Sequence, residues 1–209
     1  MKVSSKRVVL MSLAAATLVA SLSACVPLVV GGGFASGVLV AMDRRTSGAQ
    51  LEDQGIELRG SNRLKEALGD NARVSVTSYN RQVLLTGEVP RTEDIQRAEQ
   101  IIAKVENVGS VVNDLAVGIP AALTQRSTDL LITSKVKASL IDAKDLQANA
   151  FKVVTERNVV YLMGRVTQRE ANRATEIARG VKDVAKVVRV FETLTEEELA
   201  RLGQQPPAK

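Results

Sequence analysis

The chain has 209 residues, of which 45% are hydrophobic, 24% are charged and only 2% are aromatic, and its formal net charge is +5. It contains no histidine and a single cysteine. This composition excludes the commonest general base and metal ligand, every Ser-His or Cys-His catalytic pair, and any intramolecular disulfide or cysteine cluster.

The first 24 residues have the pattern of an export signal. Three of the first seven residues are basic, an apolar run extends from Val8 to about Leu22, and small residues follow it. A charged start, a short apolar segment and small residues before the cleavage point are typical of a secretory signal and not of a membrane-spanning helix. We therefore expect residues 1–24 to be a signal peptide. The alternatives are an ordinary secreted protein with one stray thiol and a single-pass membrane anchor.

The end of this signal, Leu22-Ser23-Ala24-Cys25, resembles the lipobox of bacterial lipoproteins. That resemblance implies that the thiol of Cys25 carries a fatty acid such as palmitate and that Cys25 becomes the first residue of the mature chain. Cleavage removes three basic residues and no acidic residue, so the mature net charge is +2. Nucleic acid is not an expected partner, because the chain is exported and has few aromatic side chains for base stacking.

Residues 25–54 are expected to be the lipidated cysteine and a tether. Val26–Met42 is mostly apolar but is interrupted by Pro27 and three consecutive glycines. It is shorter than the roughly 20 apolar residues that a spanning helix needs, so it either lies near the lipid surface or inserts a second time. Ser47–Gln54 is predicted to be a polar linker.

The rest of the chain contains an internal repeat. Val74–Thr77 and Val83–Val89 align with Phe151–Val154 and Val160–Val166 at a constant offset of 77 residues, and the valines further along align at an offset of 76. Agreement over so many positions indicates a duplication.

The two copies, residues 55–118 and 126–193, predict the same order of elements. The first helix is expected over Ser61–Leu68 and Asp129–Ile141, where apolar residues recur every four positions. The fold class is therefore α+β, with two tandem α-β-β-α-β domains, each a three-stranded sheet with two helices on one face. Residues 194–209 are expected to form a loose C-terminal tail with a short helix remnant. The other expected elements are hairpin turns at Tyr79–Gln82 and Glu156–Asn158, second helices that open after Thr92-Glu93-Asp94 (Thr92 as N-cap) and Gln168-Arg169-Glu170, and last strands at Val111–Val117 and Val187–Phe191.

This order of features resembles the dual BON-domain outer-membrane lipoproteins. They share the lipobox, the glycine-rich apolar tether and two α-β-β-α-β units, each with Val-x-Leu-x-Gly-x-Val at Val83–Val89 and Val160–Val166. The resemblance implies attachment to the periplasmic face of the outer membrane, binding of anionic phospholipid by the second domain, and a role in envelope integrity and division. Val26 agrees with outer-membrane sorting, because lipoproteins kept in the inner membrane usually have aspartate there.

The two copies differ in net charge, and the second copy is the positive one, as binding to anionic lipid requires. Residues 55–118 hold 8 basic and 9 acidic residues, for a net charge of −1, whereas residues 126–193 hold 13 basic and 8 acidic residues, for a net charge of +5. A basic surface is attracted to anionic lipid. The alternative is an ordinary solvated surface.

The first helix of the second copy supplies the candidate site. A helical period of 3.6 residues places Leu130 and Leu131 on the face opposite its core stripe, beside lysines. Leucines that enter the acyl boundary while lysines meet phosphates are typical of a membrane-surface helix. The alternative is that the leucines pack against the first copy. The family resemblance implies a Trp at the position that matches Leu131, so this chain departs from the family there. The candidate phospholipid-binding residues are Leu130, Leu131, Ser134, Lys135 and Lys137.

Two functions therefore remain open, and neither is enzymatic. The chain is either a lipid-anchored protein that binds anionic phospholipid, or an adaptor for outer-membrane assembly, peptidoglycan remodelling or division proteins with lipid only as its tether. No catalytic residue, metal site or cofactor is expected. Gly31–Gly33 is not followed by the Lys-Ser/Thr of a phosphate loop.

Overall fold

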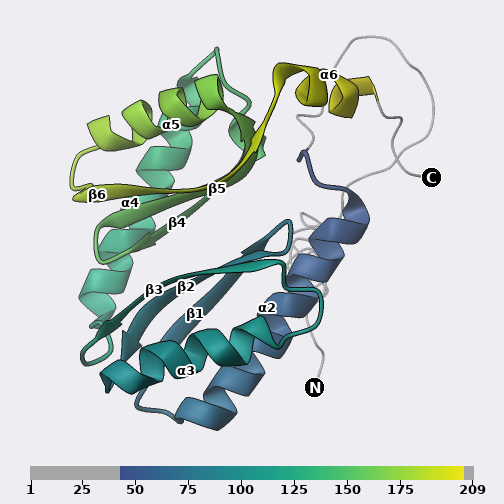
Figure 1. Ribbon diagram of the computed structural model, residues 1–209. Helices are drawn as coiled ribbons and strands as arrows, with labels where there is room; N and C mark the ends of the chain where they lie inside the picture. The colour runs from purple at the N-terminus through teal and green to yellow at the C-terminus, as the bar shows by residue number, and fades with distance from the viewer. Residues whose placement is uncertain (1–42, 205–209) are drawn as a thin grey trace, which may run out of the picture. The chain divides into compact units, whose positions relative to one another are not determined.

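The computed structural model describes residues 43–204. The predicted signal peptide, Cys25 and the tether as far as Met42 lie outside the described residues, as do the last five residues of the predicted tail. Two copies of one α-β-β-α-β unit follow each other (Figure 1), which confirms the predicted fold class. The first unit contains α2 (Ser47–Leu68), β1 (Arg73–Tyr79), β2 (Gln82–Val89), α3 (Thr92–Ala103) and β3 (Ser110–Val117). The second contains α4 (Leu123–Asp142), the short 3-10 helix η2 (Ala148–Ala150), β4 (Phe151–Glu156), β5 (Val159–Thr167), α5 (Gln168–Gly180) and β6 (Lys186–Leu194), and α6 (Glu196–Gln204) follows it.

Each sheet has its second strand in the middle. β1 pairs antiparallel with β2 through the hairpin, and β3 pairs parallel with β2 after the crossover through α3. The second sheet repeats this arrangement with β4, β5 and β6. Because the parallel pair needs a crossover connection, the helix between the strands is forced onto one face of the sheet.

Each domain has its own apolar core between its sheet and its two long helices. In the first domain Ile56 and Leu64 of α2 pack with Leu85 of β2 and Ile102 of α3. In the second domain the same layer is built around Ile132, Val136 and Leu140 of α4, with partners from β5 and α5. No helix within residues 43–204 is long and apolar enough to cross a membrane.

Two local predictions were wrong. Ser47–Gln54 is not a linker but the first two turns of α2, which begins after Thr46, whose side chain accepts a hydrogen bond from the backbone of Ala49. The glycines and polar residues of this segment give it a low helix propensity. It is helical because tertiary packing stabilises it, and such contacts can outweigh a weak intrinsic propensity. The N-cap of α3 is Arg91 rather than Thr92. The short helix predicted in the C-terminal tail is confirmed as α6.

A buried aspartate from the first helix of each domain holds the hairpin turn. Asp53 accepts hydrogen bonds from the backbone N–H groups of Asn80 and Arg81, and from the Ser78 hydroxyl. Asp129 does the same in the second domain for the backbone of Arg157 and Asn158. The turn residues Asn80, Arg81, Arg157 and Asn158 all have positive φ, a conformation that only a few per cent of non-glycine residues adopt.

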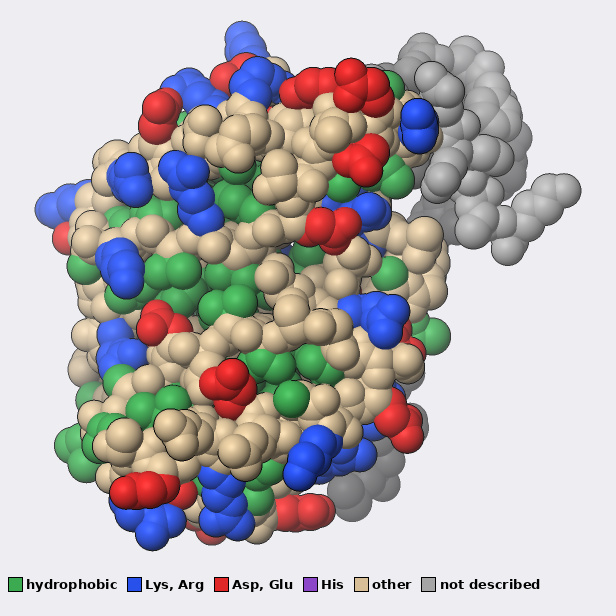
Figure 2. All heavy atoms as spheres, in the orientation of Figure 1, with side chains coloured by type: hydrophobic (Ala, Val, Ile, Leu, Met, Phe, Trp, Pro, Cys, Tyr) green, Lys and Arg blue, Asp and Glu red, His purple; other side chains and the backbone are tan. Residues whose placement is uncertain are grey.

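The two sheets face each other, and the helices lie on the outside (Figure 1). An apolar cluster joins the faces of the sheets that the helices do not cover; it includes Tyr79 and Leu84 from the first domain and Tyr161, Met163 and Val190 from the second. Figure 2 shows apolar side chains between the two sheets, with charged side chains above and below them. The Tyr161 hydroxyl also donates a hydrogen bond to Asp114 of β3. The two domains therefore share a small second core.

Candidate membrane-binding site

Helix α4 is held firmly by its inner face. Ile132, Val136 and Leu140 are at most 1% exposed, and Asp129, on the same face, is tied to the β4–β5 turn. Because side chains on one helix face recur every three to four residues, these contacts also determine which residues point away from the protein.

The outer face of α4 carries large aliphatic side chains. Leu130 is 69% exposed and Leu131 is 62% exposed. The prediction that this pair lies opposite the core stripe is confirmed, and the alternative that it packs against the first domain does not hold. Exposed aliphatic side chains in a contiguous row on a helix mark an interaction surface.

Two further residues on this face were missed from the sequence. Leu123 is 74% exposed and Ile141 is 69% exposed, and the helical period places both within about 20° of Leu130. Leu123 was missed because the helix was expected to start at Asp129, six residues too late. Spacings of 7 and 11 residues from Leu130 were the available signal. Leu123, Leu130 and Ile141 therefore form an apolar row roughly 27 Å long, and Leu131 projects about 100° further round the helix.

The predicted polar members of the site also lie at the outer surface of α4. Lys135 makes an ion pair with Asp183 at 3.2 Å, but both side chains are more than 40% exposed, so the pair contributes little and can open. Lys137 is exposed, and its ammonium makes no hydrogen bond or ion pair with any residue of 43–204. The Ser134 hydroxyl donates to the carbonyl of Leu130 at 2.9 Å within the helix.

The segment just before α4 is hydrogen-bonded to the first domain through a group of buried charges. Arg73 of β1 pairs with Glu88 of β2 at 3.2 Å and with Glu156 of β4 across the domain boundary. Burial raises the pKa of Glu156, with Arg73 acting in the opposite direction. The same Glu88 accepts a hydrogen bond from the backbone of Ala121, just before α4. The connection between the domains is therefore fixed in place.

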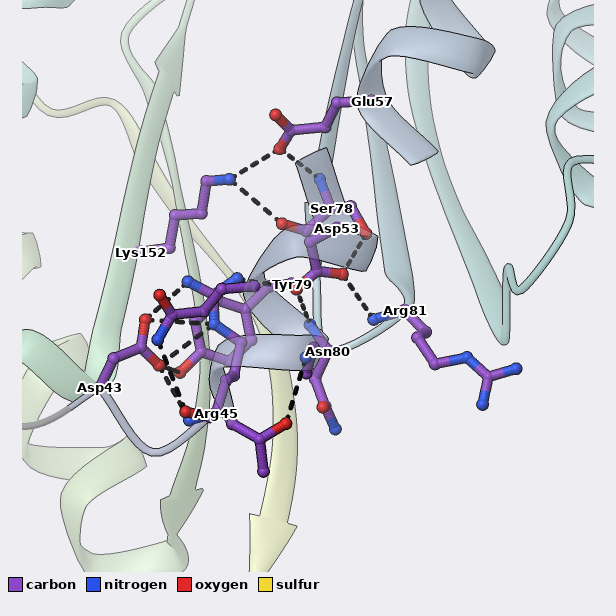
Figure 3. Close-up of polar contacts among 12 residues, drawn as sticks. Asp43, Arg45, Asp53, Glu57, Ser78, Tyr79, Asn80, Arg81 and Lys152 are labelled. Atoms are coloured by element: carbon purple, nitrogen blue, oxygen red, sulfur yellow. Dashed lines mark hydrogen bonds and ion pairs between the residues drawn. The ribbon is translucent and has the colours of Figure 1, made fainter. Parts of the chain in front are cut away.

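Residues Asp43–Arg45, which lie within the predicted tether, form a strap across the domain boundary (Figure 3). The Arg45 guanidinium lies over the Tyr79 ring, 4.1 Å from its centre, and pairs with Asp53 at 2.7 Å. The Tyr79 hydroxyl donates to Ala150 of the second domain. Burial, together with the charge of Asp43, raises the pKa of this hydroxyl to about 12, so it stays a donor at neutral pH.

Arg44 of the strap is the strongest link to the second domain. Its guanidinium donates to both carboxylate oxygens of Glu170 at 2.7 Å and to the carbonyl of Arg165 at 2.9 Å. The side chains of Arg44 and Glu170 are only 6% and 4% exposed. Burial by itself raises the pKa of Glu170, but the bonds from Arg44 and from the backbone of Thr167 outweigh it, and the net pKa is lowered. The tether therefore ends on the same domain that carries α4.

The described residues offer little for other chemistry. Within residues 43–204 no cluster of acidic, histidine or cysteine side chains could hold a metal ion. The buried carboxylates are occupied by structural partners: Asp53 and Asp129 hold turns, and Glu170 both binds Arg44 and caps α5 with Thr167. The outer face of α4 is therefore the surface whose composition points most clearly to a partner.

Comparison with known proteins finds one family in both repeats. Residues 59–119 and 128–194 each match the BON domain model. The outer membrane lipoprotein DolP of Haemophilus influenzae is 37% identical over 175 residues, which cover 83% of this chain and 90% of that protein. A 21 kDa hemolysin of Actinobacillus pleuropneumoniae is 34% identical, covering 72% of this chain and 78% of that protein. The osmotically-inducible protein Y of Escherichia coli is 40% identical over 60 residues, covering 28% of this chain and 30% of that protein. None of the three is named as an enzyme.

Proposed function

Given that this chain belongs to the BON-domain family and carries two copies of the domain, we propose that it is a lipoprotein of the outer membrane that binds anionic phospholipid. Acyl chains on Cys25 anchor it to the periplasmic face of the membrane, and the outer face of α4 makes a second contact with the bilayer. In this role it supports envelope integrity and division. The similarity to DolP supports the location.

The observation that carries the proposal is the row of exposed aliphatic side chains on α4, in the domain of net charge +5. Leu130 and Leu131 enter the acyl boundary, while the lysines beside them meet lipid phosphates, each basic residue near the surface contributing roughly 1 kcal/mol. The first domain, of net charge −1, gains nothing from such a surface. The leucine at position 131 supplies hydrophobicity but lacks the interfacial preference of an indole.

The contact through α4 can be weak, because the anchor already holds the protein at the membrane. Each buried methylene of an acyl chain contributes about 0.8 kcal/mol, so several chains give lasting attachment. Tethering then raises the local concentration of α4 at the lipid surface. The anchor itself is tested by Cys25→Ser: we expect the protein to leave the membrane fraction and to incorporate no labelled fatty acid.

The lipid contact is tested with residues 26–209, which contain every described element. We expect this form to bind vesicles that contain phosphatidylglycerol and to ignore vesicles of phosphatidylcholine alone. Leu131→Glu should weaken binding at least tenfold, because a charge replaces a side chain that enters the bilayer. The matched control is Leu58→Glu on α2, whose side chain is 65% exposed against 62% for Leu131. Equal binding to both kinds of vesicle, or equal loss in both variants, would refute the proposal.

An adaptor function is the second candidate, and a separate surface favours it. Leu51 and Leu58 of α2 are 70% and 65% exposed, and their seven-residue spacing places them on one helix face. The acidic domain that carries them is unsuited to anionic lipid, so a protein of outer-membrane assembly, peptidoglycan remodelling or division is the fitting partner class. Loss of a crosslinked partner in Leu58→Glu, with vesicle binding intact, would support it.

A further inference from the structure

The connection between the two domains has an unusual composition. Val117–Leu123 contains the turn formers Gly118 and Pro120 but no charged or hydrogen-bonding side chain, although the connecting segments of a water-soluble protein normally carry polar side chains as well. Its larger side chains are turned outward: Val117 is 52% exposed, Ile119 is 88% exposed and Leu123 is 74% exposed. Ile119 is thus almost as open to solvent as it would be in an unfolded chain.

This connection is held in shape on both sides of Ile119. The backbone N–H of Gly118 donates to the carbonyl of Val89 at 3.0 Å, and the backbone N–H of Ala121 donates to the carboxylate of Glu88 at 3.2 Å. Glu88 is itself buried and paired with Arg73. The protein therefore presents Ile119 on a fixed support, which a mobile loop would not do.

The connection also continues the apolar row of α4. It ends at Leu123, the first residue of α4 and the first member of that row; in Figure 1 the loop from β3 meets the starting end of α4. Arg126, one turn into the helix, is exposed; its backbone N–H donates to the carbonyl of Ala122, but its guanidinium makes no hydrogen bond or ion pair within residues 43–204. An apolar projection with a free cation behind it has the chemistry of the boundary between acyl chains and headgroups.

We infer that the connection between the domains is itself a membrane-inserting element, with Ile119 entering the acyl region of an anionic bilayer and Arg126 meeting lipid phosphate. This inference rests on the proposed lipid binding by α4 and extends it: the contact begins in the connection, runs along α4 to Ile141, and thereby sets the helix parallel to the membrane surface. A bilayer is the favoured occupant because the row continues into the basic domain, whereas the domain on the other side of the connection is acidic.

A single-cysteine scan tests this directly, since removal of residues 1–25 takes away the chain's one cysteine and leaves all of the described residues, 43–204, in place. An environment-sensitive fluorophore is attached at Ile119→Cys, at Leu130→Cys on α4, and at Leu58→Cys on α2 as the control. With vesicles of phosphatidylglycerol and phosphatidylcholine, we expect the emission at positions 119 and 130 to shift to the blue and that at position 58 to stay unchanged.

The other outcomes separate this inference from the proposed function. A shift at 130 without one at 119 overturns the inference and leaves lipid binding by α4 standing, as would be the case if a protein covers the connection. No shift at either position removes both. An equal shift at 58 shows that the label drives adsorption, and this also overturns the inference. Without a label, Ile119→Ser should weaken vesicle binding about tenfold with unchanged circular dichroism, and Leu58→Ser should not.

Discussion

Removal of Arg44 is expected to be one of the most damaging single changes outside the apolar cores. The guanidinium satisfies both oxygens of Glu170 and the carbonyl of Arg165 at 2.7–2.9 Å, in a site where the Arg44 and Glu170 side chains are 6% and 4% exposed. Arg44→Ala leaves the carboxylate of Glu170 buried without its cation. Loss of one partner of a buried ion pair costs about 3–5 kcal/mol.

The pH dependence of this loss follows from the pKa of Glu170. Its folded-state pKa lies below the usual value of 4.5, so the pair contributes stability above pH 4.5 and loses it as the pH falls through the folded-state pKa. In Arg44→Ala the burial remains and the cation is gone, so the pKa of Glu170 rises and the charged form becomes the destabilising one. The difference between the two proteins is therefore largest near pH 7; it begins to shrink as the pH falls through the raised pKa of Glu170 in the variant, and it shrinks further below about pH 4.5, where the unchanged protein loses the contribution of the pair.

Thermal unfolding of residues 26–209 at several pH values measures both effects. A loss of about 3 kcal/mol lowers the Tm by on the order of 6–12 °C for a unit of this size. The matched control is Arg173→Ala: Arg173 pairs with Asp145 at 3.1 Å, but the two side chains are 46% and 50% exposed, so less than about 1 kcal/mol is expected. Similar losses in the two variants, or a loss in Arg44→Ala that does not change with pH, would refute the reasoning.

Two more predictions concern stability and are checked by urea denaturation. Gly87→Ala should lower the free energy of unfolding by more than about 1 kcal/mol, because φ at Gly87 is +117° and a Cβ there would lie 2.0 Å from the carbonyl oxygen of Arg73. The control is Gly180→Ala, where a Cβ would meet nothing within 4 Å; it should leave stability unchanged or raise it by at most about 1 kcal/mol. Asp53→Ala should lower the free energy of unfolding by about 2–4 kcal/mol, because three donors of the first hairpin lose their buried acceptor. A decrease below about 1 kcal/mol would show that the hairpin turn is stable without Asp53.

The repeat made the fold predictable, because two copies that agree in spacing report the same elements twice. The hairpins and the crossover helices follow from alternation and helical periodicity, which are local properties of the chain. The start of α2 could not be predicted in this way. Its first turns contain Gly48 and Gly55 and little apolar pattern, and they are helical because Asp53 and Ile56 find buried partners in other elements.

The candidate site was predictable in part for the same reason. Leu130 and Leu131 could be placed on the outer face of α4 from the period of its core stripe alone. Leu123 would have followed from the same period if the helix had been expected to start six residues earlier. Ile119 could not be placed, because its exposure depends on how the connection is held by Glu88 of the other domain. The sequence alone likewise offered no indication that the strap binds the second domain, since Arg44 and Glu170 are 126 residues apart.

What the sequence determined by itself is the local order of helices and strands, the duplication, and the difference in charge between the copies, because each can be derived from the order of the residues without knowing which side chains touch. The tertiary structure decided how the two domains meet and which apolar side chains stay in water. Those outcomes depend on long-range contacts: the facing of the two sheets around Tyr161, and the buried charges that fix the strap and the connection. A local pattern contains no information about partners more than a hundred residues away.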